Sequence, residues 1–140
     1  INAIRKIQSQ STSNPSSISQ AAAVEALNGQ QNFIKERAEA FKERRDFVVS
    51  SLNNIKGINC LTPNGAFYVF PSCKGLLNKN TKLKTDTEFV QKLLEKSMVA
   101  VVQGSAFGLD GYFRISYATS MENLKKAIAR IKDFCDSLNN

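Results

Sequence analysis

The sequence has 140 residues with a formal net charge of +7, 42% hydrophobic residues and 22% charged residues. These values are typical of one folded domain and exclude a disordered chain. No apolar run reaches the roughly 20 residues that a membrane-spanning helix needs. The first ten residues lack the features of a signal peptide and an initiator methionine, so we expect the chain to begin inside a longer protein.

The residue types limit the chemistry. The sequence has no histidine, and its three cysteines, Cys60, Cys73 and Cys135, are far apart. This pattern disfavours a zinc site and a disulfide framework. We therefore expect no metal, and free thiols in the reducing environment of the cytoplasm. Serine–histidine and cysteine–histidine catalysis are excluded, which leaves Lys, Asp, Glu, Tyr or a cofactor.

The positive charge raises the question of nucleic-acid binding. The basic residues are spread over 35–45, 74–84 and 125–132, and most of them alternate with acidic residues. Dedicated nucleic-acid modules usually add a glycine-rich or aromatic motif. We therefore predict a solvated basic surface that binds neither nucleic acid nor membrane. A stand-alone, non-catalytic α/β binding or regulatory module with such a surface remains an alternative.

The N-terminal third is predicted to be helical after an initial loop. The polar segment 8–19 indicates a loop, and Asn14 followed by Pro15 is typical of a helix start. This helix should end at Asn28–Gly29. A long amphipathic helix is expected over 31–53, with Arg45 inside its apolar stripe. The stripe consists of Ile34, Ala38, Phe41, Val48 and Leu52.

The remaining sequence alternates between strands and helices. The β-branched and aromatic segments predict strands at 58–61, 66–70, 99–102 and 112–117. A polar loop is expected over 71–85. Capping-box patterns at Thr85 with Glu88 and at Thr119 with Glu122 predict two helix starts. The last helix should bury Leu124, Ile128, Ile131, Cys135 and Leu138. The expected fold is α/β, or α+β: a small sheet covered by helices.

Arg114 is the most informative single residue. It lies in an otherwise apolar strand, where an unpaired buried charge would be costly. Such an arginine either extends outward to solvent or binds an anion, and its planar fork suits a carboxylate. The residues alone leave both readings open.

Four segments resemble one enzyme family. FRISYATS at 113–120 is similar to the C-terminal signature of the fold-type-I, class I/II aminotransferases that depend on pyridoxal phosphate (PLP). GAFYVFP at 65–71, QSQSTSNP at 8–15 and VVQGSAFG at 101–108 resemble further motifs of that family, in the same order. The resemblance covers nearly the whole chain and is strongest to the aspartate aminotransferase branch.

The resemblance implies roles for individual residues. Arg114 would bind the α-carboxylate of the amino-acid substrate, and Phe107 would line the site, although core packing explains Phe107 equally well. Ser13 and Asn14 would lie near the active site of the neighbouring subunit, which implies a homodimer. For Asn14, a helix-capping role is the simpler interpretation.

The resemblance also implies an architecture and a cofactor. Residues 1–30 would be the tail of a large PLP-binding domain, 31–53 an inter-domain helix and 54–140 the small C-terminal domain. The parent enzyme would transfer an amino group between aspartate and 2-oxoglutarate, giving oxaloacetate and glutamate, and prephenate-type or other acceptors stay open. No lysine here has the context of the PLP-binding lysine, so we expect no catalytic residue in this chain and no activity from it alone.

The sequence departs from the family at two positions. Gln103 stands where the family usually has a proline before the loop glycine, which affects the expected stiffness of that loop. Ser9 stands where some aspartate aminotransferases have a second arginine for the distal carboxylate. A preference for dicarboxylates would therefore depend on residues elsewhere.

Overall fold

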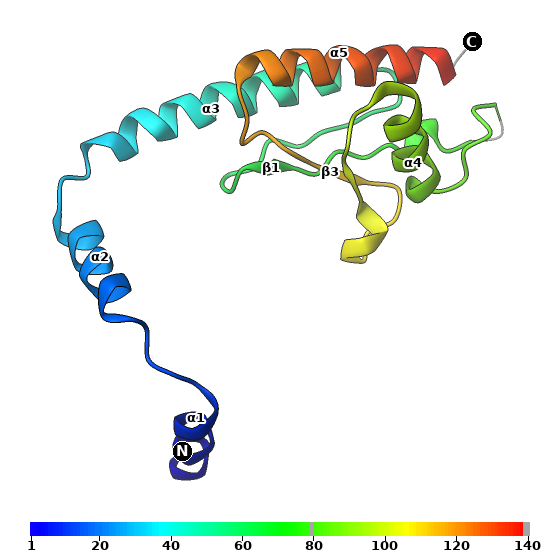
Figure 1. The fold of residues 1–140 in the computed structure, drawn as a ribbon. Helices are drawn as coiled ribbons and strands as arrows, with labels where there is room; N and C mark the ends of the chain where they lie inside the picture. The colour runs from blue at the N-terminus through cyan, green and yellow to red at the C-terminus, as the bar shows by residue number, and fades with distance from the viewer. Residues whose placement is uncertain (79, 139–140) are drawn as a thin grey trace. The chain divides into compact units, whose positions relative to one another are not determined.

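The computed structural model describes residues 1–78 and 80–138. These contain five α-helices and three short β-strands (Figure 1). The chain has two compact units, Ile1–Glu36 and Arg37–Asn140. In the second unit a small antiparallel sheet is combined with helices, as expected for an α/β arrangement.

The first unit differs from the prediction at its start. Helix α1 spans Asn2–Ser11 and helix α2 spans Ser17–Asn28, so the predicted loop over 8–19 is wrong at both ends. Asn14 does not cap α2. The hydroxyl of Ser16 does so, accepting the N–H of Ser19 at 3.2 Å. The predicted end at Asn28–Gly29 is confirmed, with the Gly29 N–H donating to a carbonyl in the last turn at 2.7 Å.

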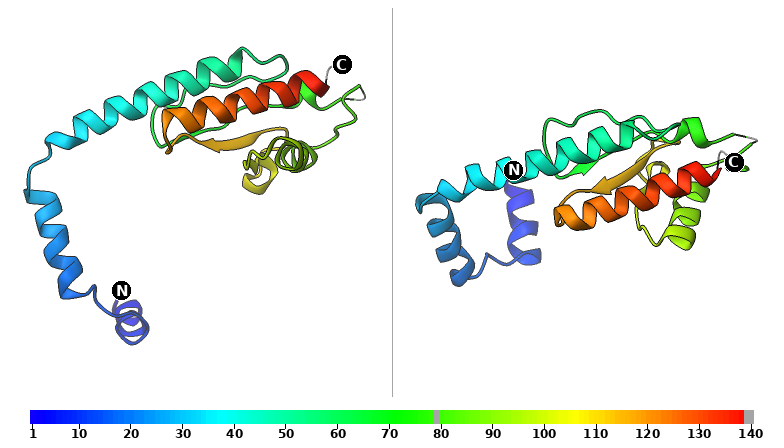
Figure 2. Two further views of the ribbon diagram at one scale, coloured as in Figure 1. Left: turned by 45° about the horizontal axis from the view of Figure 1, so that its top comes forward. Right: turned by 90° about the horizontal axis from the view of Figure 1, so that it is seen from above.

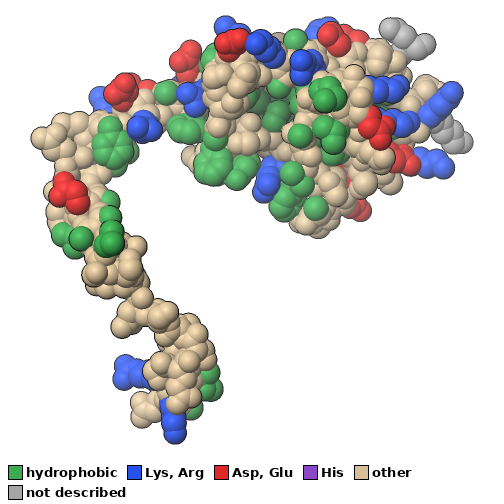
Figure 3. Space-filling model, viewed as in Figure 1, with side chains coloured by type: hydrophobic (Ala, Val, Ile, Leu, Met, Phe, Trp, Pro, Cys, Tyr) green, Lys and Arg blue, Asp and Glu red, His purple; other side chains and the backbone are tan. Residues whose placement is uncertain are grey.

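Neither α1 nor α2 buries a residue. Large apolar side chains are exposed along this unit, and Figure 3 shows several of them at its surface. They are Ile1, Ile4, Ile7, Ile18, Val24, Leu27, Phe33 and Ile34.

The long helix α3 spans Asn32–Asn53, within one residue of the predicted start. The C-terminal part of the predicted stripe is confirmed, since Val48 and Leu52 are fully buried. Arg45 is partly buried at the polar edge of this stripe. Its guanidinium donates to Asp46 Oδ1 at 2.7 and 2.9 Å and to the Pro63 carbonyl at 3.3 Å.

The strands form one sheet within the described residues. Strands β1 (Tyr68–Val69), β3 (Phe113–Ser116) and β2 (Val102–Gln103) lie in the order β1-β3-β2, all antiparallel. The register pairs Tyr68 with Ser116 and Val102 with Arg114. The predicted strands over 66–70 and 112–117 are thus confirmed in a shorter form. The strand predicted over 99–102 is displaced, because β2 shares only Val102 with it.

The predicted strand over 58–61 forms only an isolated bridge between Asn59 and Ser72. Its neighbour on the other side is the side chain of Asn53, at the end of α3. The Asn53 amide donates to the Cys60 carbonyl at 2.9 Å, and its oxygen accepts the Cys60 N–H at 2.8 Å. The backbone groups of Cys60 are therefore satisfied without a ladder, which explains the missing strand.

Alternate residues of β3 face opposite sides of the sheet. Phe113 and Ile115 are buried in the core, whereas Arg114 and Ser116 face away from it. The second half of α3 lies beside helix α5 (Met121–Leu138), and both lie over the same face of the sheet (Figures 1 and 2). The core face of the sheet is thus covered by helices, and Arg114 lies on the opposite face.

Helices α4 (Asp86–Ser97) and α5 complete the second unit. The predicted cap of α4 is confirmed, because Thr85 Oγ1 accepts the Glu88 N–H at 3.1 Å. The predicted cap of α5 is displaced by one residue: Ser120, not Thr119, accepts the Asn123 N–H, at 3.2 Å. Four of the five residues predicted on the buried face of α5 are buried, and Leu138 is partly buried.

The segment predicted as a polar loop over 71–85 contains the short 3-10 helix η1 (Lys74–Leu76). It also inserts Cys73, Leu76 and Leu83 into the core, all less than 2% exposed. The lysines between them conceal this burial in the sequence. Lys79 and Asn139–Asn140 lie outside the described residues.

Candidate functional site

Arg114 lies on the open face of the sheet, between two aromatic rings. Its guanidinium carbon is 4.5 Å from the ring centroid of Tyr68 and 4.6 Å from that of Phe107. Tyr68 comes from β1, and the register places it diagonally across the sheet from Arg114. Such diagonal neighbours are within reach of aromatic and long side chains. The two rings hold the planar guanidinium from two sides through cation–π contact.

Phe107 reaches Arg114 from a separate loop. The 3-10 helix η2 (Gly104–Phe107) follows β2 directly. Gly104 is buried, and a Cβ atom there would collide with the Leu109 carbonyl and lie 2.8 Å from Tyr112 Cβ. Glycine at this position therefore lets the loop lie close against the start of β3, and this brings Phe107 to Arg114.

The aromatic surface continues beyond Phe107. The ring of Phe70 contacts Phe107 edge-on at 5.9 Å and stacks on Tyr112 at 5.8 Å. Lys74 Nζ lies 4.9 Å from the centre of the Tyr112 ring. Phe107 is 50% exposed. Figure 3 shows hydrophobic and basic side chains together below the helices of this unit.

In the described part of the chain, no acidic side chain forms an ion pair with Arg114. Within residues 1–78 and 80–138 the ion pairs involve other basic residues, and no hydrogen bond is formed by its guanidinium. A half-buried guanidinium with free N–H donors and two flanking rings is suited to an incoming carboxylate, which can accept two parallel hydrogen bonds. The site thus presents a cation that contacts two aromatic rings.

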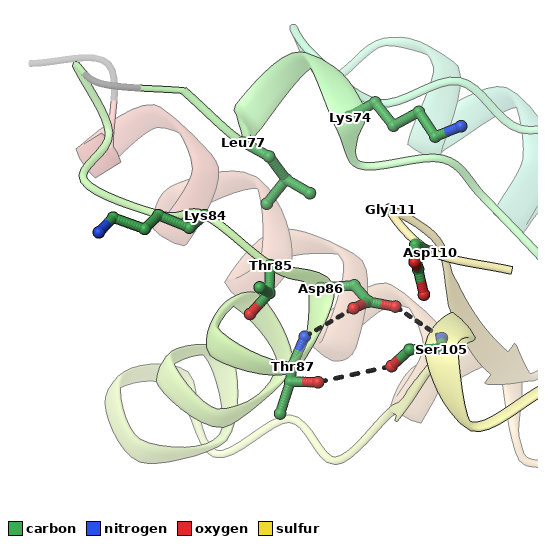
Figure 4. A pocket seen from close by; sticks show the side chains of 9 residues that line it. All are labelled: Lys74, Leu77, Lys84, Thr85, Asp86, Thr87, Ser105, Asp110 and Gly111. Atoms are coloured by element: carbon green, nitrogen blue, oxygen red, sulfur yellow. Dashed lines mark hydrogen bonds between the residues drawn. The ribbon is translucent and has the colours of Figure 1, made fainter. Parts of the chain in front are cut away.

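The loop that carries Phe107 is attached to helix α4 by a carboxylate. Asp86, only 3% exposed, accepts the Ser105 N–H at 2.7 Å and the Thr87 N–H at 3.0 Å. Figure 4 shows these bonds at the edge of a cavity of about 380 Å³. Arg114 does not line that cavity.

The comparison with known families decides the chain's membership. The model of the family described as aminotransferase class I and II matches residues 1–131. This chain is a class I and II aminotransferase family member. The resemblance drawn from the four sequence segments is thereby confirmed.

The relatives of this aminotransferase chain are similar over almost all of its length. It is 58% identical to the aspartate aminotransferase of Rhizobium meliloti strain 1021 over 99% of the chain. It is also 58% identical to a probable aspartate/prephenate aminotransferase of Rhizobium leguminosarum bv. phaseoli over 96% of the chain. In both cases the chain spans 35% of the relative's length.

A solved structure gives the same result for the fold. The crystal structure of the aspartate aminotransferase from Rhizobium meliloti superposes on 96% of this chain with a TM-score of 0.90 and 57% identity. The matched part is 35% of that crystallised chain. The aminotransferase fold of the matched segment is therefore shown, for about a third of an enzyme of this type.

The other two predicted site residues lie in the first unit. Ser13 and Asn14 are exposed in the connection 12–16 between α1 and α2. Because Ser16 caps α2, the helix-capping role expected for Asn14 is wrong. Its cross-subunit role remains a prediction.

The residues around Arg114 indicate which kinds of group this part of the chain could bind. The guanidinium of Arg114 fits a carboxylate, and neither Tyr68 nor Phe107, which contact it, has an amine that could hold PLP. Among the described residues, no cluster of three or more histidine, cysteine or acidic side chains could bind a metal. The same residues include no helix long and apolar enough to cross a membrane.

Two residues of this region were missed in the sequence. Tyr68 was interpreted only as a β-forming aromatic residue, although its two-residue spacing from Phe70 could have placed both on one face of the sheet. Asp86 follows the capping threonine and resembles an ordinary first-turn acid. No local pattern links it to Ser105, which lies 19 residues further along the chain.

Proposed function

We propose that this chain is the C-terminal part of a PLP-dependent aminotransferase and that Arg114 binds the α-carboxylate of its substrates. The observation that carries the proposal is the guanidinium of Arg114, held between Tyr68 and Phe107 with no acidic partner among the described residues. A substrate carboxylate would supply the missing negative charge. Phe107 would border the bound substrate.

The parent reaction that we propose is the exchange of an amino group between aspartate and 2-oxoglutarate. The high identity to relatives named aspartate aminotransferase supports this choice. Other relatives are named aspartate/prephenate aminotransferase, so prephenate-type acceptors belong to the same proposal. PLP, when bound, serves as the electron sink of such reactions. Its lysine and most of its contacts would lie outside this chain, which would be inactive alone.

The proposed architecture follows the boundaries expected from the sequence. Residues 1–30 would belong to the large domain, 31–53 would link the domains, and 54–140 would form the small domain. The exposed apolar residues of α1 and α2 are consistent with a segment that packs on other parts of a larger protein. We further propose a homodimer in which Ser13 and Asn14 lie near the neighbouring active site. A cytoplasmic location remains a prediction.

The coding sequence upstream of Ile1 gives the first test. We expect a reading frame that continues upstream and encodes a Ser-Lys motif within a few tens of residues. A start codon directly before Ile1 would contradict the proposal and favour a stand-alone binding module.

Substitution of Arg114 gives the second test, in the longer enzyme that contains this chain. Arg114→Leu removes charge-assisted hydrogen bonds, so KM for the amino acid should rise roughly 10- to 150-fold. Arg130→Leu is the matched control, because Arg130 is exposed on α5. If both variants keep the KM of the unaltered enzyme, Arg114 does not bind the carboxylate.

A further inference from the structure

Asp86 is a buried acid with an unusual set of partners. Carboxylates are rarely buried unless they are paired or hydrogen-bonded. At 3% exposure, Asp86 has no basic partner in the described part of the chain and accepts two backbone N–H groups instead. One comes from Thr87 in its own helix, at 3.0 Å, and the other from Ser105, at 2.7 Å (Figure 4).

The bond to Ser105 joins two elements that are distant in the sequence. Ser105 is the second residue of η2, and Phe107, at the end of η2, contacts Arg114 at 4.6 Å. Segment 103–111 contains three glycines and no proline, so its sequence does little to restrict the backbone. Its conformation therefore depends on external attachments.

The described structure provides several such attachments. At the far end of the segment, the Gly111 carbonyl accepts the Cys73 N–H at 2.9 Å. The Gly104 N–H donates to the Tyr112 carbonyl at 2.7 Å, which fixes the beginning of the loop to the residue before β3. The Asp86 carboxylate fixes the next residue to α4. A weaker contact of 3.5 Å between the hydroxyls of Thr87 and Ser105 lies beside it. Together these contacts determine where η2 places Phe107.

We propose that Asp86 is a positioning residue for the arginine site: its buried carboxylate holds the η2 loop so that Phe107 packs against Arg114. The inference rests on the proposed function, because it assigns Asp86 an effect on the substrate carboxylate through Phe107 and Arg114. Asp86 itself would not touch the substrate.

The test is Asp86→Asn in the longer enzyme, assayed by steady-state kinetics. Asparagine has one acceptor oxygen where aspartate has two, so one of the two N–H donors loses its partner. KM for the amino acid should rise roughly fivefold, as expected for the loss of one hydrogen bond, while kcat changes little. Asp110→Asn is the matched control. Asp110 borders the same cavity but is exposed and has no hydrogen bond among the described residues.

A double substitution separates positioning from a general structural effect. In an Arg114→Leu background, Asp86→Asn should add no further rise in KM, because its effect passes through Arg114. Hydrogen exchange of the backbone over 103–109 should accelerate in Asp86→Asn and not in Asp110→Asn. If Asp86→Asn does not fold, Asp86→Glu retains the charge, displaces the carboxylate and should raise KM in the same way.

The outcomes are distinguishable. An unchanged KM in Asp86→Asn, or an equal rise in both backgrounds, overturns the positioning role while the function of Arg114 stands. An unchanged KM in Arg114→Leu overturns the proposed function, and the positioning role with it.

Discussion

Arg114 and Tyr68 face each other across two neighbouring strands, with the guanidinium carbon 4.5 Å from the centre of the tyrosine ring. The contact arises from the antiparallel register of β1 and β3, which puts both side chains on the face of the sheet opposite the helices. The ring of Phe107 contacts the same guanidinium, with its centroid 4.6 Å from the guanidinium carbon. A cation held in one plane loses less entropy when it binds a carboxylate.

Replacement of Tyr68 should therefore weaken substrate binding. A cation–π contact contributes about 0.5–2 kcal/mol, so Tyr68→Ala in the longer enzyme should raise KM for the amino acid roughly 2- to 30-fold. Tyr68→Phe retains the ring and should stay close to the unaltered enzyme. Steady-state kinetics of the two variants decide the matter. Equal KM values would mean that the ring does not hold the guanidinium.

The sequence predicted most of the elements but few of the contacts between them. The helix over 31–53 was predicted within one residue. Its apolar stripe and the Asn28–Gly29 signal that ends the preceding helix are both local features of the sequence. Helix α1 was missed, since Ser and Gln in its last turn favour a loop on composition alone. At Asn14–Pro15 the cap signal was overridden by Ser16, a competing cap two residues later.

The candidate site shows the same division. Arg114 could be selected from the sequence, because a charge in an apolar strand is conspicuous locally. Its partner Tyr68 depends on strand register, and Asp86 depends on a contact 19 residues away along the chain. Such non-local pairings have no signature in a single sequence. The roles of Phe107, Ser13 and Asn14 came from the family resemblance.

Gly104 should be sensitive to any side chain. A Cβ atom there would overlap the Leu109 carbonyl and approach Tyr112 Cβ to 2.8 Å, so the η2 loop would have to move away from β3. Overpacking of this kind costs about 1–3 kcal/mol. Gly104→Ala should lower the melting temperature and raise KM together.

Gly65→Ala is the control for that experiment, because no atom lies within 4 Å of a Cβ built at Gly65. Its melting temperature should match that of the unaltered protein. If Gly104→Ala melts at the same temperature as Gly65→Ala, the η2 loop does not pack as closely at Gly104 as described.

Asn53 should stabilise the end of α3. Its side chain makes two hydrogen bonds to the backbone of Cys60, at 2.9 and 2.8 Å, in place of a neighbouring strand. Loss of both should cost about 1–3 kcal/mol, so Asn53→Ala should unfold at a lower denaturant concentration. Asn54→Ala is the matched control, since Asn54 is exposed and its side chain has no partner among the described residues. Identical midpoints for the two variants would count against the contact.

The buried cysteines should be unreactive in the folded protein. Burial raises the pKa of Cys73 and of Cys135 to about 12, and the negative charge of Asp86 contributes for Cys73. Burial also raises the pKa of Cys60, to about 11. Because the thiolate is the reactive form, a disulfide reagent at pH 8 should label these three thiols only after denaturation. Fast labelling of Cys73 or Cys135 without denaturant would contradict their burial.

The same pKa shifts predict a loss of stability at high pH. In the unfolded chain the thiols ionise near the ordinary value of 9.0, whereas the folded state keeps Cys73 and Cys135 protonated up to about 12. Between these values the unfolded state binds fewer protons, so the free energy of unfolding falls as the pH rises. Denaturant titrations from pH 8 to 11 should show this decline. The decline should be less steep in the Cys73→Ala variant than in the unaltered protein at the same pH values, because one ionising thiol has been removed.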